Sequence, residues 1–273
     1  LELAASQNSA NGNGSSITHH NSEVSAAGDL TVKAGQDVKL NGANLNGNHV
    51  DLNAGRNLEI ASQQDRASYD SHQSSSGFSA SICIPPICAG VPVQGSASMS
   101  GSKIYNDFDS VQQQSGISAG DGGYNIYVGN HTQLDGAIIA SSATPDKNHL
   151  STGTLGWTDI ENHANAGGSG FSAAVSGSMG KNTTHTSDSS GNDTSKSGYS
   201  QQSGDNSLPM GTLQQTKDRA SSTTYSAISP GTIEIRNPDA QKQDVSQISR
   251  DTAAAENVLK DKFDVQKAEG SLA

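Results

Sequence analysis

The sequence predicts an all-β fold: a right-handed parallel β-helix with protruding hairpins rich in serine and glycine, and a short C-terminal helix. Three observations predict it: a repeat of 20 residues, apolar and polar residues that alternate within each repeat, and Gly and Asn residues between the alternating segments. Such alternation is typical of a strand with one face inward, and Gly and Asn are typical of turns.

The 20-residue repeat is clearest where AGQDVKL at 34–40 returns as AGRNLEI at 54–60. A longer repeat overlies it, because LNGA at 40–43 recurs as LDGA at 134–137. Short strands at a fixed coil length favour a parallel β-helix, in which each coil completes its core only against its neighbours. The alternative is an antiparallel sandwich.

Apolar residues at the inward positions of these segments form the predicted core. Small residues such as Ala43 and Ala137 suit its narrow interior. The segment 1–6 resembles 58–62, which predicts that the chain starts at the end of one repeat. The predicted core residues are Leu30, Val32, Val38, Leu40, Leu45, Val50, Leu52, Leu58, Ile60, Ile126, Leu134, Ile138 and Ile160.

The composition is polar for a folded protein, with 32% hydrophobic residues, 4% aromatic residues, 30 glycines and a net charge of −11. Composition alone is close to that of disordered chains, and the repeats are what favour a folded core. The 16 Lys and Arg residues are scattered among 27 acidic ones, so we expect no nucleic-acid partner. No apolar run has the length of a membrane-spanning helix, and no secretion signal is visible.

Two polar excursions interrupt the repeats, at about 63–115 and about 163–224. They are related, because SGFSA occurs in both, at 76–80 and at 169–173. Alternation within each excursion predicts a thin hairpin that leaves the β-helix.

The end of the chain predicts a change of structure. We expect a domain at 1–236 that includes both excursions, and a helical cap or linker at 237–273. Two roles remain open for the helix: covering the open end of the β-helix, or binding a partner. Its predicted apolar stripe consists of Ala255, Val258, Leu259 and Phe263.

One apolar segment, ICIPPICAGVPV at 82–93, stands out in this polar chain and holds both cysteines, Cys83 and Cys88. A turn at the two prolines between them would bring the sulfurs together, so we expect a small disulfide loop. A thiol pair for redox or metal chemistry is the alternative.

The second excursion lacks this segment, which makes it an insertion at the tip of the first hairpin. Two interpretations of its side chains remain open: contact with a membrane or a partner protein, or packing against the β-helix. The residues concerned are Ile82, Ile84, Pro85, Pro86, Ile87, Val91 and Val93.

The sequence predicts no catalytic site, metal site or cofactor. The carboxylates Asp29, Asp37, Asp51 and Asp135 are spread along the repeats with no base beside them. The adjacent pair His19-His20 lies in a polar loop, and no cluster has the spacing of a zinc site. A polysaccharide-active enzyme would need clustered carboxylates in a groove.

The Ala-Gly-x-Asn/Asp-Leu/Val-x-Ile/Leu pattern, HTQLDGAIIA at 131–140 and LSTGTLGWTDI at 150–160 resemble haemagglutinin repeats. Such repeats occur in filamentous haemagglutinins and in the effectors of contact-dependent growth inhibition. The resemblance covers nearly the whole chain. It implies export by two-partner secretion through a dedicated outer-membrane transporter, and display on the bacterial cell surface.

The resemblance also implies a function. In an inhibition effector, this region is a non-catalytic delivery segment that associates with the outer membrane of a target cell, or with a receptor there. It helps to translocate a C-terminal toxin that lies beyond Ala273 in the same polypeptide. The alternative is an adhesin segment of a filamentous haemagglutinin that binds cell surfaces.

Overall fold

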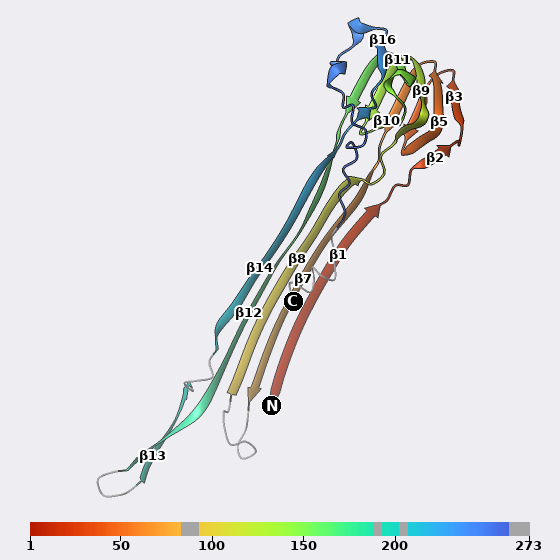
Figure 1. Cartoon of the computed structure of the whole chain (residues 1–273). Helices are drawn as coiled ribbons and strands as arrows, with labels where there is room; N and C mark the ends of the chain where they lie inside the picture. The colour runs from red at the N-terminus through yellow and green to blue at the C-terminus, as the bar shows by residue number, and fades with distance from the viewer. Residues whose placement is uncertain (83–92, 188–192, 202–206, 262–273) are drawn as a thin grey trace.

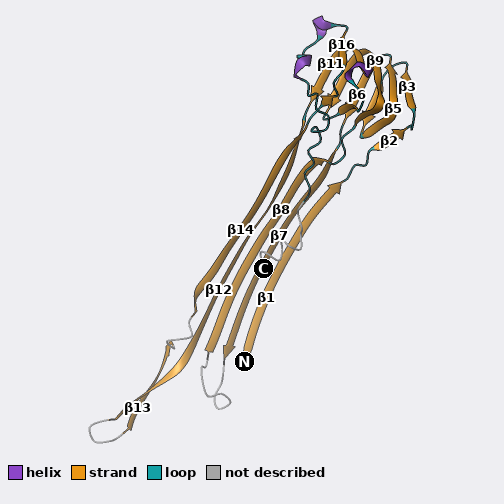
Figure 2. Cartoon of the chain, viewed as in Figure 1, coloured by secondary structure: helices purple, strands orange, loops and turns teal. Residues whose placement is uncertain are grey.

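A computed structural model describes residues 1–82, 93–187, 193–201 and 207–261, with side chains described outside 179–210. It contains two bodies: a ten-stranded sheet and a six-stranded sheet that extends from one end of the first (Figure 1). Strands dominate, and the described residues form no α-helix, only short 3-10 turns (Figure 2). The all-β prediction is therefore confirmed. No helix in this part of the chain is long and apolar enough to cross a bilayer.

Every strand pairing in the ten-stranded sheet, here called the parallel body, is parallel. The 20-residue repeat is its pairing register, since Leu30 pairs with Val50 and Val38 pairs with Leu58. Its strands are β2 (Ser22–Ser25), β3 (Asp29–Ala34), β4 (Val38–Asn41), β5 (Ala43–Ala54), β6 (Asn57–Ala61), β9 (Gly116–Asp135), β10 (Ile138–Ser141), β11 (Asn148–Thr158), β15 (Ala227–Ile228) and β16 (Thr232–Ile235).

Apolar side chains stack in columns inside the parallel body. One column runs through Val32, Leu52, Ile126, Leu150 and Ile233. The predicted core residues that are buried are Val38, Leu40, Leu45, Val50, Leu52, Leu58, Ile60, Ile126 and Leu134. Those that are half-buried are Leu30, Val32, Ile138 and Ile160.

One predicted core position is off by a residue. Ile138 is only half-buried, whereas its neighbour Ile139 is fully buried and stacks on Ile117 and Ile228. Successive side chains of a strand point to opposite faces, so only one residue of this pair can enter the core. The repeat of LNGA at 40–43 as LDGA at 134–137 locates this segment, but it does not show which residues of β10 point inward.

The Ala-Gly motif has a steric cause. Gly35, Gly55 and Gly129 follow the residues Ala34, Ala54 and Val128, which stack on one another, so the three glycines lie at the same corner of successive coils. A Cβ on Gly55 would lie 2.2 Å from the carbonyl oxygen of Gly35, and one on Gly129 would lie 2.1 Å from that of Gly55. Neighbouring strands are about 4.8 Å apart, so at this corner there is no room for a side chain that points along the stack toward the preceding coil.

The six-stranded sheet is antiparallel throughout. β7 and β8 lie within the first predicted excursion, and β12, β13 and β14 within the second or at its edges. The order is β1-β7-β8-β12-β13, and β14 also pairs with β12. Its strands are β1 (Glu2–Ile17), β7 (Gln64–Ile82), β8 (Val93–Val111), β12 (Ile160–Ser187), β13 (Asp193–Gln201) and β14 (Ser207–Thr224).

This sheet corrects two expectations. The two excursions, predicted as thin hairpins that leave the β-helix, instead pair with each other and with β1 in one antiparallel sheet. The N-terminal residues do not end a coil either. β1 pairs antiparallel with β7 along its whole length, so the prediction from the resemblance of 1–6 to 58–62 was wrong.

The predicted C-terminal helix is wrong for the described residues. Ala255 lies at a bend, Val258 and Leu259 lie in a segment without regular secondary structure, and Phe263 lies outside the described residues. Ser110 near the end of β8 and Gln112 just after it bind backbone groups that a helix would use. Gln112 donates to the Leu259 carbonyl at 2.7 Å, and the Leu259 N–H donates to Ser110 Oγ at 3.1 Å.

Two glutamines cover part of the last coil where a helical cap was expected. The Gln241 side-chain amide accepts from Leu155 N–H at 2.8 Å and donates to the Leu155 carbonyl at 2.7 Å. Gln243 repeats this with Trp157, at 2.9 and 3.0 Å. Each glutamine thus satisfies backbone groups at an edge of β11 as a further strand would. The 3-10 turns η2 (Pro238–Ala240) and η3 (Val245–Gln247) flank them, and η1 (Pro145–Lys147) precedes β11.

Candidate functional site

The distal half of the antiparallel sheet has an exposed apolar face. Its large apolar side chains are exposed by between 41%, at Val93, and 90%, at Leu213. We call them the apolar face, and they are Leu3, Phe78, Ile82, Val93, Met99, Phe171, Val175 and Leu213.

The strand register shows that these residues share one side of the sheet. Phe78 lies opposite Ala97, which lies opposite Val175. Phe171 lies opposite Leu213 on one neighbouring strand and Gly101 on the other. Residues opposite each other, and residues two apart along a strand, point to the same face. The Phe171 ring covers Gly101, since a Cβ there would be 2.7 Å from the ring.

The opposite face at the same level is polar. Hydroxyl pairs run across its strands: Ser79 with Ser96 at 2.7 Å, Ser75 with Ser100 at 2.6 Å, and Ser172 with Thr212 at 2.7 Å. A hollow on the sheet is lined by hydroxyl, amide and apolar groups and by no titratable side chain. It offers hydrogen bonds but neither an acid nor a base for catalysis.

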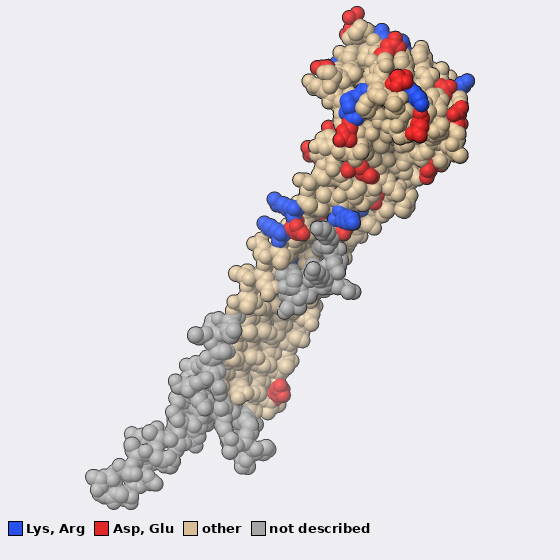
Figure 3. Space-filling model, viewed as in Figure 1, with Lys and Arg blue, Asp and Glu red and all other residues tan. Residues whose placement is uncertain are grey.

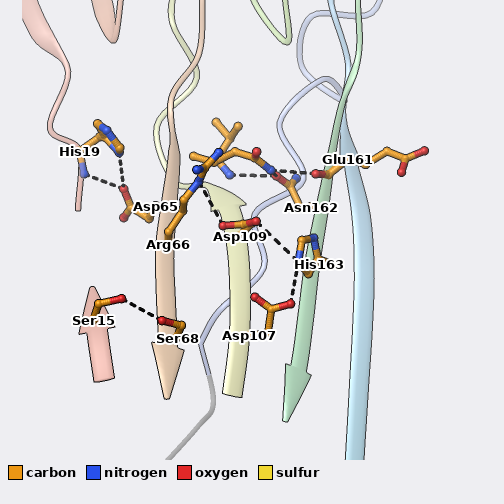
Figure 4. A network of polar contacts seen from close by, with 12 residues as sticks. Ser15, His19, Asp65, Arg66, Ser68, Asp107, Asp109, Glu161, Asn162 and His163 are labelled. Carbon is orange, nitrogen blue, oxygen red and sulfur yellow. Dashed lines mark hydrogen bonds and ion pairs between the residues drawn. The ribbon is translucent and has the colours of Figure 1, made fainter. Parts of the chain in front are cut away.

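A belt of charged residues separates the apolar face from the parallel body. Arg66 lies 3.3 Å from Asp109, while His163 lies 3.6 Å from Asp109 and 3.4 Å from Asp107 (Figure 4). Lys103 approaches a further aspartate on β7 at 3.9 Å. Figure 3 shows charged side chains on the body and at this level of the sheet, and very few beyond it. Such exposed pairs each contribute only about 0–1 kcal/mol.

The structure describes only the two ends of the predicted tip. Ile82 and Val93 pair with each other at the end of β7 and β8, and are 47% and 41% exposed. The other tip residues lie outside the described residues: Cys83, Ile84, Pro85, Pro86, Ile87, Cys88 and Val91. Contact by this tip and a disulfide between its cysteines therefore stay predictions.

The disulfide has a direct test. We expect the purified, non-reduced and denatured chain to show no reactive thiol, because Cys83 and Cys88 are the only cysteines and are predicted to pair. The same assay after reduction and removal of the reductant is the control and should count two thiols. Two reactive thiols before reduction would rule the disulfide out.

The predicted carboxylates do not converge. Asp37 binds Arg56, Asp51 accepts from Asn125 at 3.4 Å, and Asp135 accepts from Gln133 at 2.7 Å. Among the described residues, no group of three His, Cys, Asp or Glu side chains is placed to hold a metal ion. Asp29, Asp51 and Asp135 lie on the separate strands β3, β5 and β9, and Asp37 lies between β3 and β4.

Two pKa shifts in the parallel body have structural causes. The hydrogen bond from Arg56 holds the pKa of the Asp37 carboxyl below its ordinary value. Burial raises the pKa of the Tyr124 hydroxyl to about 12, and this hydroxyl donates to the Ser229 carbonyl at 3.3 Å. Both shifts arise from local hydrogen bonding and burial within the parallel body, as structural contacts also produce.

Comparison with known proteins gives a consistent result along the chain. The family described as hemagglutinin repeat matches residues 1–77. A tRNA nuclease CdiA of Escherichia coli strain STEC_O31 is 38% identical over 98% of this chain, and a deoxyribonuclease CdiA of Dickeya dadantii is 38% identical over 96%. The chain matches a haemagglutinin-repeat region of CdiA-type proteins.

These CdiA relatives are much longer than the matched region. The chain spans 8% of the Escherichia coli CdiA and 7% of the Dickeya dadantii CdiA. It spans 24% of a deoxyribonuclease CdiA of Yersinia pseudotuberculosis, to which it is 37% identical along its whole length. No solved structure matches the chain.

Sequence reasoning missed the apolar face, although it noted the tip. The alternation of Phe171, Ala173 and Val175 with the small residues Ser172 and Ala174 was visible. That pattern shows one strand with an apolar side, but it does not show which strands lie beside it.

Proposed function

We propose that this chain is a non-catalytic structural and delivery segment of a two-partner-secreted effector of contact-dependent growth inhibition. The similarity to CdiA-type proteins over nearly the whole chain supports this class. In this proposal, the parallel body is a right-handed β-helix that supports the antiparallel sheet. The sheet associates with the outer membrane of a target cell, or with a receptor there.

The apolar face is the observation that carries the proposal. Phe78, Met99, Phe171 and Val175 are each about half exposed on one side of the sheet. Large exposed apolar patches mark surfaces that bind proteins or membranes.

The remaining parts of the proposal concern the longer polypeptide. The chain is exported through a dedicated outer-membrane transporter and displayed on the cell surface. Residues 1–236 form the haemagglutinin-repeat domain, and 237–273 lead toward a pretoxin region and a toxin in cis. The nuclease names belong to the CdiA relatives, and this chain matches their haemagglutinin-repeat part.

Membrane association can be tested with outer-membrane vesicles. We expect the wild-type chain to float with vesicles in a density gradient, and the double variant Phe78→Ser, Phe171→Ser to lose most of this association. Both rings lie on the apolar face, and replacing each by a hydroxyl group removes a transfer free energy of roughly 2 kcal/mol. Both are partly exposed, so unfolding by urea should change little.

A matched control lies on the parallel body. Val24 on β2 is 51% exposed, similar to Phe78, yet lies away from the antiparallel sheet. Val24→Ser should leave flotation unchanged. Equal flotation of the wild type and the double variant would contradict a contact through the apolar face. Binding to intact cells without binding to vesicles made from their lipids would favour the adhesin alternative.

A further inference from the structure

The strands of the antiparallel sheet alternate in direction relative to the parallel body. β7 and β12 run outward from it, whereas β1, β8 and β14 run back to it. Each returning strand leads into the same column of the body: β1 into β2, β8 into β9, and β14 into β15. That column stacks Val24, Leu45, Ile117, Ile139 and Ile228.

This topology defines what fits beside β1. From one edge to the other, the order of strands in the antiparallel sheet is β1, β7, β8, β12 and β14. Strands that run back to the body alternate in this order with strands that run outward. In the described residues, no strand pairs with the outer edge of β1. Because β1 runs back to the body, a strand that continued the antiparallel order beyond this edge would run outward.

The backbone groups that this strand would meet can be named. Leu1 and Ile82 exchange two hydrogen bonds of 2.7 Å, from each N–H to the other carbonyl. The register of β1 on β7 has no shift, so odd-numbered residues of β1 face β7 and even-numbered ones face the open edge. The outward residues are Glu2, Ala4, Ser6, Asn8, Ala10, Gly12, Gly14 and Ser16.

The two edges of the sheet differ in how they are protected. β14, at the other edge, contains Pro209, Lys217 and Arg219, and its pairing with β12 shifts register between Ala174 and Ser176. Proline, charged residues and bulges are the usual means of preventing a sheet edge from pairing. Across 16 residues, β1 has no proline, no lysine and no bulge, and its one charged residue is Glu2.

We propose that the outer edge of β1 is a strand-acceptor site. Its occupant is an antiparallel, outward-running strand of the same longer polypeptide, with the alternating small apolar residues and serines found in β7 and β12. Such a strand would place apolar side chains beside Leu3 and extend the apolar face. The similarity to CdiA-type proteins, of which this chain spans 8% in one case, is consistent with a strand from elsewhere in the polypeptide.

A synthetic peptide with the sequence of β7, residues 64–82, serves as the probe for the full 273-residue chain. We expect saturable binding by fluorescence anisotropy, with hydrogen-exchange protection of the even-numbered amides of β1. Ala10→Pro removes one outward N–H and should weaken binding at least tenfold. Its melting temperature should stay unchanged, because proline is tolerated where the N–H of an edge strand faces solvent.

Ser9→Pro is the matched control at the next position. It removes an N–H that faces β7, so it should lower the melting temperature, unlike Ala10→Pro. Binding that Ala10→Pro does not weaken, or peptide protection of β14 instead of β1, would overturn the proposal. So would self-association of the chain through β1 without peptide binding, since the occupant would then be a second copy.

Discussion

Gly129→Ala is expected to lower the free energy of unfolding by about 3 kcal/mol or more. A methyl group there would lie 2.1 Å from the carbonyl oxygen of Gly55, far inside contact distance. The two coils cannot separate, because Asn130 N–H donates to the Arg56 carbonyl beside this corner, and β5 and β9 pair along their length. Urea unfolding followed by circular dichroism measures the loss.

Gly35→Ala is the matched control for this prediction. Gly35 occupies the same corner of the first described coil, where nothing lies within 4 Å of a new Cβ. Its stability should change by less than about 0.5 kcal/mol, as for most surface substitutions. Equal losses in both glycine variants would contradict a contact between coils, since the entropy of the unfolded chain by itself favours alanine over glycine.

The parallel body was predictable because residues one sequence repeat apart are also the residues that pair between strands. In a parallel stack, residues one coil apart become neighbours, so the offset of 20 residues between Ala34 and Ala54 is also their pairing. A repeat in the sequence does not give the pairing where a coil has extra residues. The Asn-His pairs at 48–49 and 148–149 suggest that Leu150 corresponds to Val50. Leu150 instead stacks on Ile126 and Leu52, because η1 changes the length of the turn before β11.

The antiparallel sheet was only partly predictable. Two related excursions indicated hairpins, and their strands form as expected for alternating sequences. The apolar face depends on the register between Ala97 and Val175, which are far apart in the chain. No local pattern fixes that register. The C-terminal helix failed for a similar reason, since the helical spacing at 255–259 was overridden by long-range hydrogen bonds to the sheet.

Asn162→Ala is expected to cost about 2–4 kcal/mol, because several buried groups lose their partners together. Asn162 is 1% exposed at the point where β12, β14 and the C-terminal segment meet. Its Nδ2 donates to Thr224 Oγ1 at 2.9 Å and to the Asn257 carbonyl at 3.3 Å. Its Oδ1 accepts from the Val111 N–H at 2.9 Å.

The loss should have a local signature as well as a global one. Asn162 holds the C-terminal segment through Asn257, so hydrogen exchange at 255–261 should accelerate in Asn162→Ala even well below the unfolding transition. Asn125→Ala is the control, since Asn125 is exposed and makes one long hydrogen bond of 3.4 Å to Asp51. Unchanged exchange at 255–261 in Asn162→Ala would mean that other contacts hold this segment without it, from Ser110 and Gln112 and from Ser222 and Thr223 of β14. The junction between the antiparallel sheet and the C-terminal segment would then depend on β8 and β14, not on β12.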